Sequence, residues 1–185
     1  MTPKHTNRLS LENIERAMSV IDPVFLHTPQ YRCESLEMLL GCKVLLKVET
    51  INPIRSFKGR GTSFLISQIT DRSPLVCASA GNFGLALAYV GRKTEIPAIV
   101  FASHSANPLK LQRIRETGGE VRLSGNDFEE TKIEARLFAK SKGLRFVEDT
   151  RDVATCEGAG TIAVELFQRN PEISDVLAAL GNGAL

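Results

Sequence analysis

The middle of the chain alternates short apolar runs with amphipathic stretches. The apolar runs have the length of strands and lie at residues 75–78, 98–101, 120–123 and 144–147. Between them are stretches that place apolar side chains at helical spacing, at residues 83–92, 108–117 and 127–142. Strands that alternate with helices over short links predict a parallel sheet with right-handed crossover connections, so the predicted fold class is α/β.

The pattern also predicts where several helices begin and end. Asn107 precedes Pro108 and is a suitable N-cap for the second of these helices, and Gly143 is suited to end the third. Nearer the N-terminus, Ser10 precedes apolar residues spaced as on one helical face, at Leu11, Ile14, Ala17 and Met18. The remaining expected elements are a helix at 35–40 ended by Gly41, a strand at 44–48, a helix at 161–168 and a strand at 176–180.

Length and composition narrow the class of protein. The chain has 185 residues, which fits one domain or two small ones that share a core. Its 23 Lys and Arg against 21 Asp and Glu give a net charge of +2, with no clustered basic excess, which argues against a nucleic-acid partner. No apolar run approaches the ~20 residues that span a bilayer, and the N-terminus lacks the apolar stretch of a secretory signal. We therefore expect a cytoplasmic protein with no membrane partner.

The cysteines and histidines suggest no metal site. The cysteines lie far apart without a C-x-x-C pair, at Cys33, Cys42, Cys77 and Cys156. This spacing favours reduced thiols over a disulfide framework or a zinc site. The histidines are also scattered without ligand spacing, so no metal is expected.

The segment Ser56–Gly61 is the first candidate for chemistry. Lys58 lies between Phe57 and Gly59, at the start of a predicted helix. A lysine held near an aromatic ring and partly desolvated can lose its proton and act as a nucleophile or an imine-forming amine. Glycines beside it let another group approach the backbone closely. The alternative is a solvated lysine in a loop.

Two further glycine-containing segments could hold anions. Residues 79–84 lie between a predicted strand and helix, where unpaired backbone N–H groups bind a carboxylate or phosphate and where Asn82 adds a side-chain amide. Residues 181–184 follow the last predicted strand, and a glycine-rich turn in that place can cradle phosphate, although a terminal tail would look the same. Neither segment has the spacing of a nucleotide-binding motif.

In this order, the segments resemble the fold-type II family of pyridoxal-phosphate-dependent enzymes, the tryptophan synthase β-like superfamily, and most closely its threonine and serine dehydratase branch. The resemblance runs from about residue 10 to the end and also includes Thr28-Pro29, Lys47-Val48-Glu49 and Gly158–Ala163. It implies a three-layer parallel-sheet fold in which residues 72–153 form a complete small domain. Residues 1–71 and 154–185 would then belong to a large cofactor domain that is incomplete here.

The resemblance also implies a role for each candidate residue. Lys58 would bind pyridoxal 5'-phosphate covalently through its amine and later remove the α-proton of the substrate, while Phe57 would pack near the cofactor. Asn82 would hydrogen-bond the phenolic oxygen of the cofactor. The substrate carboxylate would be held by Ser79 and by the amides of Ala80, Gly81, Asn82 and Phe83. The cofactor phosphate would be held by Gly181, Asn182, Gly183 and Ala184.

The implied reaction is elimination from a small hydroxy amino acid such as L-threonine or L-serine, which gives a 2-oxo acid and ammonia. Ala80 stands where serine racemase has a serine that acts as acid and base, which argues against racemisation. Further departures from the family pattern are Arg55, Phe83, Asn182 and Ala184, which are expected to alter the substrate pocket and the phosphate loop.

The family's large domain continues beyond the glycine-rich loop, so the sequence predicts a fragment of a longer lyase. One alternative is a catalytically inactive α/β module that binds an amino acid or a partner chain. Others are a short enzyme that completes its site as a homo-oligomer, and an activity like that of threonine synthase or diaminopropionate ammonia-lyase.

Overall fold

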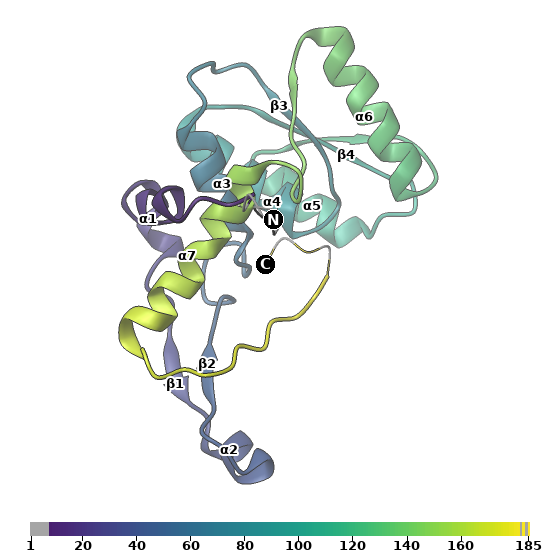
Figure 1. The fold of residues 1–185 in the computed structure, drawn as a ribbon. Helices are drawn as coiled ribbons and strands as arrows, with labels where there is room; N and C mark the ends of the chain where they lie inside the picture. Colours follow the sequence, from purple (N-terminus) through teal and green to yellow (C-terminus); the bar gives the residue numbers. More distant parts are fainter. Residues whose placement is uncertain (1–7, 182, 184) are drawn as a thin grey trace, which may run out of the picture.

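The computed structural model describes residues 8–181, 183 and 185 (Figure 1). Its helices are α1 (Leu11–Val20), α2 (Glu34–Leu40), α3 (Lys58–Ser67), α4 (Asn82–Thr94), α5 (Pro108–Glu116), α6 (Phe128–Lys142) and α7 (Val153–Arg169), with a 3₁₀ turn at Pro23–Phe25. Its strands are β1 (Gln30–Arg32), β2 (Leu45–Lys47), β3 (Leu75–Ala78), β4 (Ala98–Ala102), β5 (Glu120–Leu123) and β6 (Arg145–Phe146).

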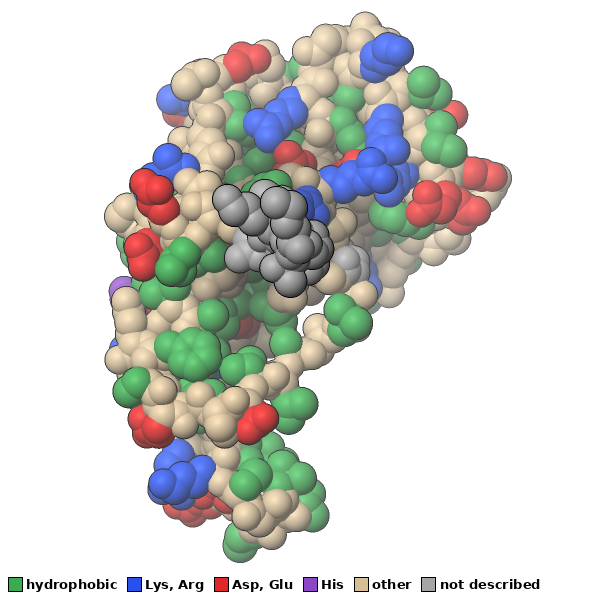
Figure 2. Space-filling model, in the orientation of Figure 1, with side chains coloured by type: hydrophobic (Ala, Val, Ile, Leu, Met, Phe, Trp, Pro, Cys, Tyr) green, Lys and Arg blue, Asp and Glu red, His purple; other side chains and the backbone are tan. Residues whose placement is uncertain are grey.

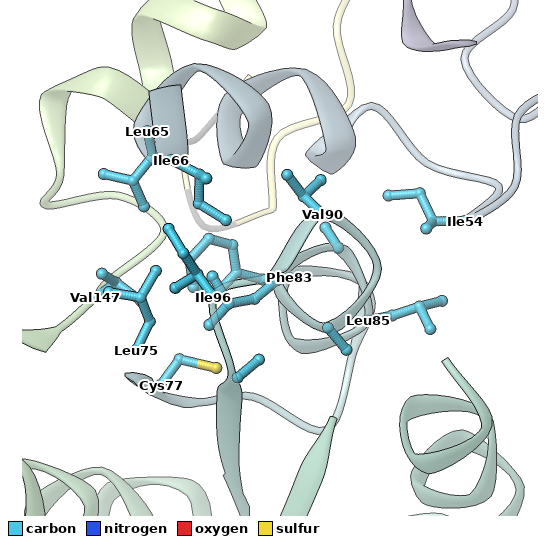
Figure 3. Packing of buried hydrophobic residues seen from close by; sticks show 14 of the residues in the cluster. Ile54, Leu65, Ile66, Leu75, Cys77, Phe83, Leu85, Val90, Ile96 and Val147 are labelled. Atoms are coloured by element: carbon cyan, nitrogen blue, oxygen red, sulfur yellow. The ribbon is translucent and has the colours of Figure 1, made fainter. Parts of the chain in front are cut away.

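The main sheet is parallel, with the strand order β5-β4-β3-β6. Alternate residues of its inner strands point to opposite faces. On one face, Cys77 and Val100 belong to a cluster with residues of α3, α4 and α5 (Figure 3). On the other face, Val76 and Ile99 pack with Ala135 of α6. The structure confirms the predicted α/β class with a parallel sheet between helical layers.

Several helix ends lie where the sequence predicts them. The side chains of the predicted caps Ser10 and Asn107 accept hydrogen bonds from the first turns of α1 and α5. Asp127, the first residue of the helix predicted at 127–142, is instead the N-cap of α6, and its side chain accepts from the N–H of Glu130. Gly41 and Gly143 end α2 and α6 with φ angles of 68° and 64°, which glycine adopts without the cost that a Cβ imposes.

Helix α7 is longer than predicted, because it begins at Val153 and includes Gly158 and Gly160. These glycines allow close helix packing. A Cβ on Gly61 of α3 would lie 2.3 Å from the carbonyl oxygen of Thr155, and a Cβ on Gly158 would lie 2.6 Å from the Cα of Gly61. A Cβ on Gly160 would meet Ile14 of α1 at 2.9 Å. The group that approaches the backbone at Gly61 is therefore a neighbouring helix.

Strands β1 and β2 form a separate antiparallel hairpin with α2 between them. In Figure 2, hydrophobic side chains gather at the lower end of the molecule, over α2. Met38 and Leu39 there are 82% and 78% exposed.

The strand predicted at residues 176–180 is wrong. The chain after α7 runs without secondary structure along the lower part of the molecule (Figure 1), and Leu177 is 99% exposed. A strand needs a hydrogen-bonding partner, and no strand of the described residues pairs with this segment.

All strands of the main sheet come from residues 75–146, inside the predicted small domain at 72–153, although the domain division itself stays a prediction. Within residues 8–181, no helix has the length and hydropathy needed to cross a membrane.

Candidate functional site

Lys58 is the first residue of α3, and its amine is held on two sides. The Nζ atom lies 2.5 Å from Oδ2 of Asp149 and 4.4 Å from the centre of the Phe57 ring. The side chains of Lys58 and Asp149 are each 12% exposed. The alternative of a freely solvated loop lysine therefore does not describe this residue.

The loop before α3 is fixed by its own hydrogen bonds. The side-chain oxygen of Asn52 accepts from the N–H groups of Ile54 and Ser56, and its amide donates to the carbonyl oxygen of Ser56. The hydroxyl of Ser56 accepts from the N–H of Lys58 at 3.3 Å. Arg55 has a φ of 53°, a left-handed conformation that costs a residue with a Cβ roughly 1–2 kcal/mol.

Asp149 connects Lys58 to the carboxyl edge of the main sheet. The N–H of Val147 donates to the carbonyl oxygen of Val76 at 2.8 Å, so the chain leaves β6 beside β3, whose continuation is segment 79–84. Burial and the negative charge of Asp149 together raise the pKa of the Cys77 thiol above its usual range. The amine of Lys58 thus lies at the edge where parallel α/β sheets bind ligands.

Segment 79–84 is shaped as an open N-terminal turn. Gly81 caps α4 without a side-chain hydrogen bond, so the first N–H groups of the helix have no capping side chain to bond. A Cβ on Gly81 would meet only Ser79 Oγ, at 3.9 Å, so there is open space beside it. Gly84 is required by the turn itself, because a Cβ there would lie 2.3 Å from the carbonyl oxygen of Ser79.

Phe83 contributes its backbone to this turn and its side chain to the core. It is 5% exposed and lies in the hydrophobic cluster beneath α4 (Figure 3). Its side chain therefore contributes to the packing of the core. In the same turn Ala80 is partly exposed and Asn82 is exposed, which leaves the backbone and the Asn82 amide accessible to a ligand.

Two residues of the third predicted segment, Gly181 and Gly183, are described, and both have open space beside them. An added Cβ on Gly181 or Gly183 would have no neighbouring atom within 4 Å. Asn182 and Ala184 lie outside the described residues. The proposed role of residues 181–184 in phosphate binding stays a prediction.

Arg60, two residues after Lys58, carries a buried charge that the sequence pattern does not mark. Its side chain is 0% exposed, and its guanidinium contacts Glu49 at 2.9 Å and Glu165 at 2.7 Å. Lys47 also pairs with Glu165. The two cations and two carboxylates balance within one buried cluster, which also includes the hydroxyls of Thr28 and Thr161.

This cluster, which we call the Arg60 cluster, joins the β1–β2 hairpin, α3 and α7. Burial by itself raises the pKa of Glu165, but hydrogen bonds from Arg60, Lys47 and the N–H of His27 outweigh it and lower the pKa to about 2. The cluster fixes α3 two residues after Lys58. Thr28, Lys47 and Glu49 are thereby brought next to the helix that begins with Lys58.

A lysine amine at the carboxyl edge of a parallel sheet, beside an open helix N-terminus, is suited to an α/β enzyme that binds a carbonyl cofactor through lysine. The family model described as pyridoxal-phosphate dependent enzyme (PALP) matches residues 21–185, and the chain belongs to this family. The expected family and cofactor are thereby confirmed.

The relatives point the same way. The biosynthetic L-threonine dehydratase IlvA of Pasteurella multocida is 33% identical over 161 residues, which cover 85% of this chain and 31% of that protein. IlvA of Staphylococcus aureus is 30% identical over 195 residues, which cover 100% of this chain and 46% of that protein. The chain thus spans less than half the length of these relatives. A crystal structure of a pyridoxal 5'-phosphate-dependent aspartate racemase has a TM-score of 0.88 at 25% identity, covering 95% of this chain and 56% of that one.

The described residues fit part of this cofactor. Lys58 supplies the primary amine that an aldehyde needs, and the open space beside Gly81 leaves room at the N–H groups that begin α4. Asn82 offers a side-chain amide in the same turn.

Proposed function

We propose that Lys58 binds pyridoxal phosphate and that the site serves elimination on a small hydroxy amino acid such as L-threonine or L-serine, with a 2-oxo acid and ammonia as products. The observation that carries the proposal is the enclosed amine of Lys58, held at the sheet edge beside segment 79–84. Both dehydratase relatives act, by name, on L-threonine, which supports the choice of substrate class.

The residues of this chain divide the work. When bound, the cofactor supplies the electron-withdrawing ring that makes the α-proton of the substrate acidic. The amine of Lys58 accepts that proton. Ser79 and the N–H groups of residues 80–83 bind the substrate carboxylate and fix which bond of the substrate faces Lys58. The Phe57 ring, which contacts the amine, shields it from water on one side.

Elimination fits the site better than racemisation. Racemisation needs a second proton carrier on the opposite face of the substrate, and Ala80 has no exchangeable side-chain proton. The aspartate racemase that shares the fold leaves racemisation as the second activity to measure.

The test is release of 2-oxo acid from L-threonine, L-serine and diaminopropionate after the chain is loaded with pyridoxal phosphate. We expect release from the hydroxy amino acids, and a loss of about 10²–10⁴-fold in Lys58→Ala. Lys110→Ala, on the exposed surface of α5, is the matched control and should behave as the unaltered chain. Chiral analysis of the remaining serine measures racemisation in the same samples.

Release that is equal in Lys58→Ala and the unaltered chain would contradict the assignment of Lys58. Cofactor binding without any release would favour the binding module over the lyase. D-serine formation faster than 2-oxo acid release would favour racemisation.

A further inference from the structure

The amine of Lys58 forms an ion pair with the carboxylate of Asp149. Its two atoms lie 2.5 Å apart, and both side chains are largely shielded from solvent. A charged hydrogen bond in a partly buried place is stronger than an exposed surface pair. The ion pair therefore gives the amine of Lys58 a defined position.

The backbone that carries Asp149 is itself held in place. The hydroxyl of Thr155, in the first turn of α7, donates to the carbonyl oxygen of Asp149. The same hydroxyl donates to the carbonyl oxygen of Asp152 at 2.7 Å, and the carboxylate of Asp152 accepts from the N–H of Glu148 at 2.7 Å. These bonds tie the 148–152 loop to the start of α7, whose close contact with α3 at Gly61 fixes the distance between the two partners.

The ion pair with Asp149 opposes the reaction of the Lys58 amine with an aldehyde. Only a neutral amine has the lone pair that attacks an aldehyde carbon, so the ion pair must separate before Lys58 reacts. If Lys58 binds the cofactor as proposed, its amine would be released when a substrate amine replaces it, and it would then need a defined location close by.

Resting on the proposed function, we propose that Asp149 is the positioning residue of Lys58: its carboxylate holds the lysine amine whenever Lys58 is not bonded to the cofactor. Asp149 thereby slows the reaction of the free amine with aldehydes and keeps it at the sheet edge. It acts through Lys58 and is not itself a catalytic residue.

The test measures the reaction of Lys58 with two aldehydes, formaldehyde and pyridoxal phosphate, each in the presence of cyanoborohydride. In each case a C–N bond forms between Nζ and the aldehyde carbon, the carbonyl oxygen leaves as water, and hydride from the reagent reduces the imine. Peptide mass spectrometry then gives the labelling rate of every lysine separately.

With formaldehyde, we expect Asp149→Asn to label Lys58 about tenfold faster than the unaltered chain, the factor for loss of one charged hydrogen bond. Asp149→Glu should restore slow labelling, because it returns the carboxylate. Asp149→Ser is a second uncharged variant, for use if asparagine disturbs the loop. A merely structural role would give no rescue by glutamate.

The matched control is Asp22→Asn, which removes another carboxylate that lies 2.5 Å from a lysine, here Lys93. It should change the labelling of Lys93 and leave that of Lys58 unaltered. Lys47, buried in the Arg60 cluster, reports on the fold in the same samples and should label slowly in every variant.

Wild-type labelling of Lys58 in the folded Asp149→Asn and Asp149→Ser variants would overturn the proposal. The pyridoxal phosphate arm separates it from the proposed function. If formaldehyde shows the Asp149 effect and pyridoxal phosphate does not label Lys58, then the proposed function fails and the holding of the amine stands. If pyridoxal phosphate labels Lys58 and neither variant changes either rate, then Asp149 does not hold the amine and the proposed function stands.

Discussion

The substitution Arg60→Met should be among the most damaging single changes in this chain. The Arg60 guanidinium is fully buried and hydrogen-bonds both carboxylates of its cluster, at distances between 2.7 and 3.0 Å. Methionine is similar in length and apolar, so it keeps most of the packing and removes the charge. The cluster would then keep one cation, Lys47, for two carboxylates. Lys47 pairs with Glu165, which is 3% exposed, and Glu49 would lose its partner Arg60.

The expected magnitude follows from that imbalance. Removal of one partner from a buried ion pair costs about 3–5 kcal/mol, because the remaining charge is left in a poorly solvated place. Arg60→Lys should also be destabilising, since a single ammonium cannot hydrogen-bond two carboxylates as the planar guanidinium does. The control is Arg72→Met, whose side chain is 68% exposed and pairs with Glu95 at 3.3 Å, and which should cost less than about 1 kcal/mol.

The assay is urea unfolding followed by far-UV circular dichroism, with the free energy of unfolding taken from the midpoint at constant m value. The double variant Arg60→Met, Glu165→Gln should recover part of the loss, because it removes the uncompensated carboxylate. If Arg60→Met and Arg72→Met lowered the free energy of unfolding equally, the Arg60 cluster would not be a tightly coupled buried group.

Three further predictions concern stability. The folded-state pKa of Glu165, about 2, lies below its usual value of 4.5, so its stabilising contribution is present above pH 4.5 and is lost as the pH falls toward 2. Glu165→Gln should flatten that part of the curve of unfolding free energy against pH. An unchanged curve would contradict the lowered pKa of Glu165. Gly61→Ala should destabilise the fold by about 1–3 kcal/mol, because its Cβ would lie 2.3 Å from a backbone oxygen of α7. Gly81→Ala, with no atom nearer than 3.9 Å, should change the unfolding midpoint little. Equal effects of the two substitutions would contradict the close packing of α3 against α7. Arg55→Gly should stabilise the fold by up to about 1 kcal/mol in thermal unfolding, because glycine adopts the φ of 53° without strain. A clear loss of stability would show that contacts of the Arg55 side chain outweigh the backbone strain.

Local features of the fold could be predicted because their causes lie within a few residues. The caps Ser10 and Asn107 precede helical spacing, and the apolar runs of β3 and β4 have the length of buried strands. The first half of α7 could not be predicted this way, because Gly158 and Gly160 look like turn residues. Their reason is the close approach of α3 and α1, a tertiary contact that the local pattern does not contain.

The candidate site shows the same limit. Lys58 and segment 79–84 stand out because glycines and a helix start surround them. Asp149 and Glu165 do not stand out, since they lie 91 and 105 residues from the cations that they bind, Lys58 and Arg60. The apolar run at 176–180 predicted a strand only because local hydrophobicity carries no information about whether a partner strand is present.

The central claim is that Lys58 is the residue that binds pyridoxal phosphate. The most direct measurement is reduction of the loaded chain with borohydride, followed by peptide mapping of the pyridoxyl group and a comparison with Lys58→Ala. We predict that the group is found on the peptide that contains Lys58, and that the lysine-dependent visible absorbance is absent from Lys58→Ala. A pyridoxyl group spread over exposed lysines, with the same absorbance in both chains, would contradict the account.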